Sequence, residues 1–459
     1  MATAGQKASR HGAERQNPPN CWNPCTRPTP AMSAPGTELG ISPLMAGERH
    51  LSVDEARAAM AAAIQPIHAP ERVALALALG RVLAADVLSP IDVPAHDNSA
   101  MDGYAFRGAE LSASQPTVLH SVGTLFAGAP WVGGVGAGKC LRIMTGAVMP
   151  AGLDTVVPLE LCRSEGESVH IAAGVVRSGE NCRRRGEDLS AGLPALRAGR
   201  VLKPADLGLV ASLGIAEVTV QRRLRVALFS TGNELRTLGQ SLDAGSVYDS
   251  NRYSLMGALQ RLGLDVLDLG LVPDEPAALQ AALEDAMARA DVVLTSGGVS
   301  MGDADHTRDV LARMGEVAFW KVAMRPGRPI AFGPLKRQGG APPCWLFALP
   351  GNPVAALVTF YAFAREALMR LAGATPAPLP VLQARCTTAI RKRPGRTEFQ
   401  RGIVEPAPQG GWQVKLTGSQ GAGILRSMSE ANALLVLGHD QGSVPEGGMV
   451  DVWLFDGLV

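Results

Sequence analysis

The chain has almost no net charge and no apolar run of membrane-spanning length. Its 43 Lys and Arg residues balance 42 Asp and Glu residues, which leaves a formal charge of +1 over 459 residues. Such a balance provides no overall attraction to nucleic acid or to a membrane surface, so any anion site must be local. The longest apolar stretches, such as PVAALVTFYAFA, fall short of the roughly 20 residues that a membrane-spanning helix needs. We therefore expect a soluble globular protein that binds neither nucleic acid nor membrane.

Cysteine is too scarce and too scattered for a disulfide framework. The seven cysteines lie between Cys21 and Cys386, and their number is odd. This usage favours a reducing cytoplasm over secretion. Cys21 and Cys25 could in principle bind a metal, but neither a second cysteine pair nor a histidine at zinc-site spacing accompanies them, which disfavours a zinc site.

Two common nucleotide-binding motifs are also missing. The first expected strand of the α/β region is followed by STGNEL, which lacks the three glycines of a dinucleotide fingerprint. The segment GGVGAGKC (133–140) comes close to a phosphate loop, but Cys140 stands where a Ser or Thr would ligate Mg²⁺. The residues that follow it, LRIMT, are typical of a strand instead of a helix. We therefore expect neither nicotinamide chemistry nor a phosphate loop.

Composition divides the chain into a tail and four domains. The first 45 residues are rich in Pro, Gly, Ser, Ala and Asn and contain no apolar core of signal-peptide length, which predicts a disordered tail. Ser52 and Glu55 then fit a helix capping box, which indicates where ordered structure begins. The predicted domains are an N-terminal helical and β domain (46–92 with 191–222), an inserted β-rich domain (93–190), a central α/β domain (223–374) and a C-terminal β domain (375–459).

The central domain alternates strand-like and helix-like segments. RVALFS, LDVLDLG, DVVLTS, EVAFWKVA and CWLFALP read as strands, and amphipathic segments lie between them. Such alternation predicts a parallel sheet covered by helices on both faces. The fold class is thus a multidomain α/β and β protein with a central parallel α/β sheet and a C-terminal β barrel, for which a sandwich is the alternative.

Unusual residues follow the strands of the central domain. Ligands of open parallel sheets bind beyond the carboxyl ends of the strands, where glycine amides and helix N-termini can approach an anion. Asp303 and Asp305 could hold Mg²⁺ beside phosphate oxygens. Taken singly, a Ser-Gly-Gly turn or an acidic pair before a helix is more often structural. The candidate residues are Glu234, Ser296, Gly297, Gly298, Ser300, Asp303, Asp305, Lys321, Arg325, Arg328, Pro350, Asn352 and Pro353.

The inserted domain carries three further polar motifs. HDNSAMDGYAF contains Asp102, RIMTGA contains Thr145, and RRRGED contains Asp188. Asx-type turns explain most sequences of the first kind. The arginine run fits either a solvated surface hairpin or an anion clamp, and its spacing leaves both open.

In their order, these motifs resemble one known family. DNSAMDGYA, RIMTGA, RRRGED, FSTGNEL, YDSNR, SGGVSMGDAD, FWKVAMRPGRP and LPGNPV are similar to the molybdopterin molybdenumtransferase family of the bacterial MoeA type, which also forms the E domain of gephyrin. The likeness covers about residues 47–459. It implies an enzyme that takes adenylylated molybdopterin and molybdate, depends on Mg²⁺ and releases AMP. It also implies a homodimer, in which the N-terminal domain dimerises and the cleft lies between one subunit's central domain and its partner's inserted domain.

The resemblance assigns expected roles to individual positions. It implies molybdate contact for Arg325, Pro326, Arg396 and Ser427. The charge that the reaction must gather leads us to expect metal binding by Asp303 and Asp305, metal binding or water positioning by Glu234, and phosphate contact by Lys321 and Arg328. Arg325 and Arg328 stand where lysine is common in the family, which preserves charge but favours bidentate contacts. The positions of general functional importance carried over are Asp102, Thr145, Asp188, Glu234, Asp274, Asp305, Lys321, Arg325, Pro350 and Pro353.

Two other functions remain open at this stage. The chain could be a scaffold or carrier that delivers finished cofactor without turnover, as the likeness to gephyrin allows. It could also be a molybdopterin adenylyltransferase, since the central domain resembles that enzyme in fold. The expected partners are a second copy of the chain, the adenylyltransferase and molybdoenzyme chaperones, all in the cytoplasm.

Overall fold

The computed structural model describes residues 49–298, 305–337, 339, 341–375 and 377–458. All of them lie in one unit, Ile41–Val459. Within these ranges no helix is long and apolar enough to cross a membrane. The predicted tail, Ser300 and Asp303 fall outside the described residues, as do the side chains of residues 305–308.

The central sheet has seven strands in the order β1-β19-β21-β22-β18-β14-β17. Strands β17, β14, β18 and β22 run parallel, which confirms the predicted core of the sheet. β21 is antiparallel to both of its neighbours, β22 and β19, and β1 joins the edge parallel to β19. The strands are β1 (Arg49–Leu51), β14 (Arg225–Thr231), β17 (Asp265–Val272), β18 (Val292–Ser296), β19 (Ala318–Val322), β21 (Pro329–Leu335) and β22 (Cys344–Leu349).

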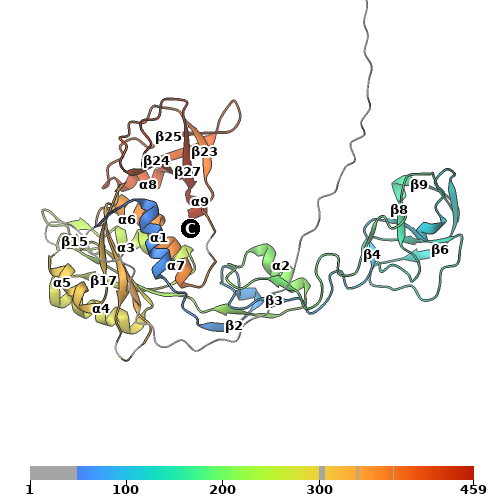
Figure 1. Cartoon of the computed structure of the whole chain (residues 1–459), viewed down its shortest axis with the longest axis horizontal. Coiled ribbons are helices and arrows are strands. Elements are labelled where there is room, and N and C mark those ends of the chain that lie inside the picture. The colour runs from blue at the N-terminus through green and yellow to red at the C-terminus, as the bar shows by residue number, and fades with distance from the viewer. Residues whose placement is uncertain (1–48, 299–304, 338, 340, 376, 459) are drawn as a thin grey trace, which may run out of the picture. The chain divides into compact units, whose positions relative to one another are not determined.

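Helices cover both faces of this sheet, because its buried strands are apolar on both sides (Figure 1). In β14, Val226 and Leu228 pack into one core, whereas Ala227 and Phe229 pack into the other. The first core receives α1 (Val53–Ala63), α3 (Asn251–Arg261), α6 (Pro353–Thr359) and α7 (Arg365–Leu371). The second receives α4 (Pro276–Arg289) and α5 (Asp305–Met314). Phe360–Ala364, between α6 and α7, forms one π-helical turn.

Short strands pair within the N-terminal segments. The capping box of α1 is confirmed: the Glu55 amide donates to Ser52 Oγ at 3.2 Å, and the Ser52 amide donates to Glu55 Oε2 at 2.7 Å. Strands from 46–92 pair with strands from 191–222, although β1 and α1 belong to the central sheet and its core. The elements are β2 (Pro70–Ala74), β3 (Val87–Leu88), β12 (Pro194–Leu196), α2 (Pro204–Ser212) and β13 (Glu217–Gln221).

The inserted segment forms a six-stranded sheet in the order β8-β5-β7-β6-β10-β9. Lys139 and Cys140 lie on β7, so the phosphate-loop lookalike leads into a strand, as the sequence predicts. The strands are β4 (Asn98–Ser99), β5 (Gly103–Phe106), β6 (Thr117–Leu125), β7 (Lys139–Ile143), β8 (Thr155–Pro158), β9 (Cys162–Glu165), β10 (Ser168–Ile171) and β11 (Cys182–Arg183).

The C-terminal segment is a closed barrel, which confirms the barrel over the sandwich. Its five strands run β24-β25-β23-β27-β26, and β26 pairs back onto β24. The short strand β20 (Met324–Arg325) pairs with β24 and thereby connects the central domain to the barrel. The barrel elements are β23 (Leu382–Cys386), β24 (Thr397–Pro406), β25 (Trp412–Leu416), α8 (Leu425–Glu430), β26 (Ala433–Leu437), β27 (Met449–Leu454) and α9 (Phe455–Leu458). The domain boundaries themselves stay predictions.

Candidate functional site

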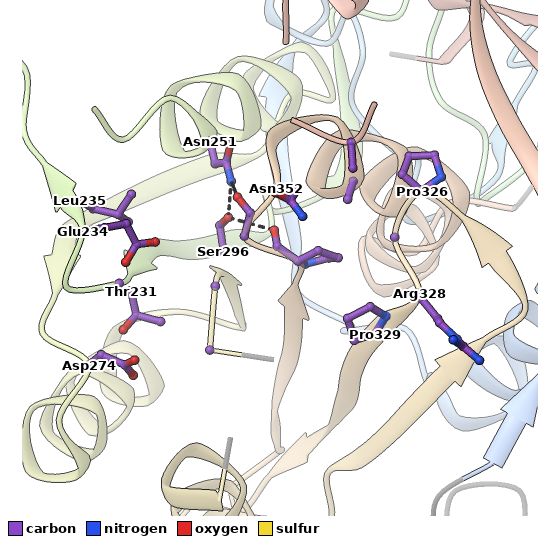
Figure 2. A pocket seen from close by; sticks show the side chains of 18 of the residues that line it. Thr231, Glu234, Leu235, Asn251, Asp274, Ser296, Pro326, Arg328, Pro329 and Asn352 are labelled. Atoms are coloured by element: carbon purple, nitrogen blue, oxygen red, sulfur yellow. Dashed lines mark hydrogen bonds between the residues drawn. The ribbon is translucent and has the colours of Figure 1, made fainter. Parts of the chain in front are cut away.

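A cavity of about 590 Å³ opens where the parallel strands β14, β18 and β22 end. Figure 2 shows Thr231, Glu234 and Asp274 on one side of it, and Pro326, Arg328 and Pro329 on the other. The loops that the sequence singled out after these strands therefore line one cavity. The predicted residues that line it are Glu234, Asp274, Ser296, Gly297, Gly298, Arg325, Pro326, Arg328, Pro350 and Asn352; Pro353 follows as the first residue of α6.

Close packing of the loops explains the glycines after β18. Gly297 and Gly298 have φ values of 93° and 70°, which favour glycine. A Cβ on Gly297 would lie 2.2 Å from the carbonyl oxygen of Thr231. The Gly297 amide donates to Leu349 O at 3.0 Å. The ends of β14, β18 and β22 thus meet at Gly297, where a side chain would force them apart.

The acidic side of the cavity carries two exposed carboxylates. Glu234, in the loop after β14, lies so close to Gly232 that a Cβ there would be 2.8 Å from both carboxylate oxygens. Asp274, in the loop after β17, lines the same side. Thr231 Oγ1 is buried and has no hydrogen-bond partner among the described residues. The described residues contain no cluster of three or more metal-ligating side chains. Asp305 opens α5, but its side chain lies outside the description.

The basic side is formed by the turn between β20 and β21. Arg325 and Arg328 are exposed, and Gly327 lies against α6, where a Cβ would be 2.3 Å from Thr359 Oγ1. This contact holds the turn at the cavity wall. Lys321 lies on β19, outside the lining of the cavity.

A second chamber of about 230 Å³ adjoins the first. The two share Arg325, Pro326 and Gln420 in their linings, and the second is otherwise formed by barrel residues. Gln420 is fixed between them, because its Oε1 accepts from the Arg401 amide at 2.8 Å and its Nε2 donates to Arg401 O at 3.1 Å.

Arg401 is the residue that the sequence did not single out. Its side chain is fully buried, and its Nη1 has no hydrogen-bond partner among the described residues. Its Nε donates to Ser427 Oγ at 3.0 Å, and its Nη2 donates to Gly421 O at 3.0 Å. Burial, together with the like charge of Arg325, lowers the pKa of Arg401 to about 10. A buried guanidinium with one unused donor, beside a second arginine, fits an oxyanion.

Arg396 is placed differently from the expectation. It forms an ion pair with Glu398 at 2.8 Å and does not line the chamber. Glu398, which does line it, is 4% exposed and also accepts from Gln400 Nε2 at 3.1 Å. Arg396 thus neutralises a buried carboxylate that would otherwise repel anions. Ser427 is buried as well, and its hydroxyl donates to Ile424 O at 2.7 Å while it accepts from Arg401.

The remaining predicted residues lie in the inserted domain. Asp102 Oδ1 accepts from both the amide and the hydroxyl of Thr145, each at 2.7 Å. The Thr145 amide is the main cause that lowers the pKa of the Asp102 carboxyl. The Asp188 amide donates to Val93 O at 2.9 Å. Neither cavity lining contains a described residue of this domain. The structure therefore brings Asp102 and Thr145 together, and neither residue lines either cavity.

The arginine run beside Asp188 is exposed, and two of its members are paired with nearby aspartates. Arg184 bonds Asp97 at 3.0 Å, and Arg185 bonds Asp92 at 2.6 Å. These pairs fit the surface-hairpin interpretation of the run better than an anion clamp.

Three family models match consecutive parts of the chain. They are described as the MoeA N-terminal region (domain I and II) at residues 51–214, a probable molybdopterin binding domain at 227–370, and the MoeA C-terminal region (domain IV) at 383–455.

Several known proteins are similar over most of the chain. A molybdopterin molybdenumtransferase of Haemophilus influenzae is 39% identical, covering 89% of this chain and 100% of its own. Molybdopterin molybdenumtransferase 2 of Mycobacterium tuberculosis is 37% identical, covering 86% and 96%. A crystal structure of a molybdopterin biosynthesis MoeA protein from Pyrococcus horikoshii superposes with a TM-score of 0.75 at 27% identity, covering 89% of this chain and 100% of that one.

Proposed function

The chain belongs to the MoeA family of molybdopterin molybdenumtransferases, and from this premise we propose that it transfers molybdenum from molybdate to adenylylated molybdopterin and releases AMP. A transferase role in molybdenum cofactor biosynthesis agrees with the names of its relatives. The observation that carries the proposal is Arg401: it lines a chamber that shares Arg325 with the larger cavity, and its buried Nη1 has no partner among the described residues.

The smaller chamber would hold molybdate. An oxyanion there would accept from Arg401 Nη1 and face Arg325, while Ser427 and Gln420 hold the Arg401 side chain and backbone in place. Arg396 would assist from a distance by neutralising Glu398. Charged donors in a site that is shielded from water bind anions strongly, because little solvent competes with them.

The larger cavity would hold the phosphate-bearing substrate. The Gly297–Gly298 turn lets the backbone approach the phosphates closely, and Arg328 adds positive charge from the opposite wall. Lys321 remains a proposed phosphate contact. Because Arg325 and Pro326 line both spaces, an anhydride in one and molybdate in the other would lie side by side.

We also propose that the reaction depends on Mg²⁺. The donor set fits: hard carboxylate oxygens of Glu234 and Asp274 lie on one side of the cavity, and the buried Thr231 hydroxyl beside them has no partner among the described residues. Asp303 and Asp305 remain proposed ligands outside that description. When bound, Mg²⁺ would supply positive charge to the phosphate oxygens of the anhydride. The carboxylates would hold it opposite Arg328.

A homodimer would complete the site. Asp102 and Thr145 form an exposed, hydrogen-bonded pair that lines neither of the two cavities described above, so we propose that they reach the partner's cleft. Four leucines of the N-terminal segments are 52% to 71% exposed, which suits a surface covered by a second copy: Leu77, Leu79, Leu88 and Leu193. Exchange with the adenylyltransferase and molybdoenzyme chaperones, and the cytoplasmic location, stay predictions.

One assay separates this function from the alternatives. Purified protein receives adenylylated molybdopterin, molybdate and Mg²⁺, and AMP and molybdenum cofactor are quantified. A transferase produces both over repeated turnovers, whereas a scaffold or carrier produces neither. An adenylyltransferase would instead consume ATP and unmodified molybdopterin, so a parallel reaction with those substrates identifies it.

A further inference from the structure

The motif YDSNR (248–252) reaches the wall of the larger cavity through Asn251. Its asparagine, Asn251, is the first residue of α3 and is 9% exposed. The side-chain nitrogen Nδ2 donates two hydrogen bonds, to Ser296 Oγ at 2.8 Å and to Gly351 O at 2.6 Å (Figure 2). One amide group therefore connects the end of β18 with the turn after β22.

The two segments that Asn251 joins form adjacent walls of the cavity. Ser296 directly precedes Gly297, and Gly351 lies between Pro350 and Asn352. The Ser296 hydroxyl donates to Pro350 O at 3.3 Å while it accepts from Asn251, so its hydrogen-bonding capacity is used inside the protein. The two turns lie close together, since a Cβ added to Gly351 would be 3.8 Å from Gly297 Cα.

The rest of the motif fixes Asn251 itself. Arg252 donates to Asp249 Oδ2 at 3.0 Å and to Asp268 Oδ2 at 2.6 Å. Asp249 in turn accepts from the Ser230 hydroxyl at 3.0 Å, at the end of β14. Arg252 and Asp249 are 6% and 2% exposed, so water competes little with these bonds. The start of α3 is thus held to β14 and β17 on one side and to β18 and β22 on the other.

We propose that Asn251 is a positioning residue for the phosphate-bearing substrate: it sets the separation between the Gly297–Gly298 turn and the Pro350–Asn352 turn, and so the shape of the pocket that receives the adenylyl phosphate. The proposal rests on the proposed function and deepens it. Two donors on one nitrogen are required, because both acceptors, a hydroxyl oxygen and a carbonyl oxygen, lie within reach of Nδ2. An aspartate would place a carboxylate oxygen against the Gly351 carbonyl.

Substitution of Asn251 should weaken the binding of adenylylated molybdopterin but not the binding of molybdate. In Asn251→Ala and Asn251→Asp, the KM for adenylylated molybdopterin and the Kd for AMP should rise about tenfold or more, because displacement of a site wall by a fraction of an ångström is amplified in binding and rate. The KM for molybdate should stay within about twofold, since Arg401 and its partners belong to the barrel. Ser296→Ala removes the hydroxyl that accepts the hydrogen bond from Asn251. It should therefore raise the same KM and Kd and leave the KM for molybdate within about twofold.

The matched control is Asn432→Ala in the barrel. Asn432 also uses its amide to bridge two segments, accepting from the Val404 amide at 2.7 Å and donating to Val404 O at 2.8 Å. Its loss should lower the thermal unfolding temperature comparably but leave the AMP affinity unchanged. A purely structural role of Asn251 would make the two variants behave alike.

The experiment measures AMP binding by calorimetry and steady-state AMP release for wild type, Asn251→Ala, Ser296→Ala and the double variant. The expected result is that the double variant binds AMP no more weakly than the worse single variant, because both changes break one connection. Additive losses, an unchanged Kd for AMP in Asn251→Ala, or equal rises in both KM values would overturn the proposal, as would a wild-type protein that binds no AMP. A wild-type protein that binds AMP but never generates AMP from adenylylated molybdopterin would contradict the proposed function alone.

Discussion

Arg401 lines the smaller chamber and donates from Nε to Ser427 Oγ at 3.0 Å, across 26 residues of sequence, while its buried Nη1 has no partner among the described residues. A buried cation of this kind is costly unless an anion compensates it. The position of Arg401 makes the barrel part of the site, although the barrel contains neither the glycine turn nor the acidic residues.

Replacing Arg401 by methionine should raise the KM for molybdate about 10- to 100-fold while the Kd for AMP stays near the wild-type value, because a lost charged hydrogen bond to an anion costs about 1.5–3 kcal/mol. Methionine retains the apolar volume of the side chain. AMP release measured against molybdate concentration gives the KM. Arg385→Met, an exposed barrel arginine that bonds Gly447 O, is the control; equal effects of both changes would argue against the oxyanion chamber.

Arg396→Ala should also raise the KM for molybdate, because it leaves the Glu398 carboxylate uncompensated at the chamber. Its effect should be reversed by a second change, Glu398→Gln, which removes the repelling charge. If Arg396 instead contacted molybdate directly, the double variant would bind molybdate as poorly as Arg396→Ala does. Molybdate titrations of the two variants and wild type decide between them.

Gly297→Ala should destabilise the protein by about 2 kcal/mol and abolish most AMP binding, since its Cβ would lie 2.2 Å from Thr231 O and the backbone is strained at φ 93°. The control is Gly410→Ala, which has φ 88° but no atom within 4 Å of the new Cβ. Urea unfolding measures stability and calorimetry measures AMP binding. Intact AMP affinity in Gly297→Ala would contradict the close packing of the loops.

Removal of divalent cations with EDTA should stop AMP release, and added Mg²⁺ should restore it. Glu234→Gln should raise the Mg²⁺ concentration for half-maximal rate about tenfold or more, because the loss of one carboxylate charge weakens binding of a hard cation. Glu405→Gln, a barrel carboxylate that bonds Gln413, is the control. A Glu234→Gln variant with wild-type Mg²⁺ dependence would remove Glu234 from the proposed ligands.

Mixing two impaired variants at a low molybdate concentration tests whether sites are shared between subunits. Asp102→Ala removes the acceptor of Thr145, and Arg401→Met is nearly silent at molybdate concentrations far below its raised KM. In a mixed dimer, one cleft would combine the intact inserted domain of one subunit with the intact chamber of the other. AMP release should therefore reappear after the subunits exchange, at about one quarter of the wild-type rate for random pairing with one active cleft in half of the dimers. No recovery in a mixed dimer confirmed by mass would show that each chain works alone.

Local patterns predicted much of the fold. Alternating strands and helices located the loops of the site, and Ser52 with Glu55 marked the first helix. β21 was missed, because Pro329 and Pro334 disfavour a strand, although Pro329 is tolerated as its first residue. Whether a segment with two prolines forms a strand depends on the strands beside it and not on its own residues.

The chemistry of the site was harder to predict than its location. Arg396 pairs with Glu398, only two residues away, whereas the partners of Arg401, Ser427 and Gly421, lie 26 and 20 residues along the chain. Asn251 reaches Gly351 across 100 residues. Contacts at this separation carry no local signature, so the sequence motif YDSNR could be noticed but not given a role.

The most direct test of the whole account is a single-turnover reaction in which adenylylated molybdopterin, Mg²⁺ and the wild-type protein are combined with molybdate at graded concentrations. The account predicts that one AMP is released for each molybdenum transferred, and that Arg401→Met shifts the molybdate dependence to higher concentration without lowering the final yield. Release of AMP at the same rate without molybdate, or an unchanged molybdate dependence in Arg401→Met, would contradict it.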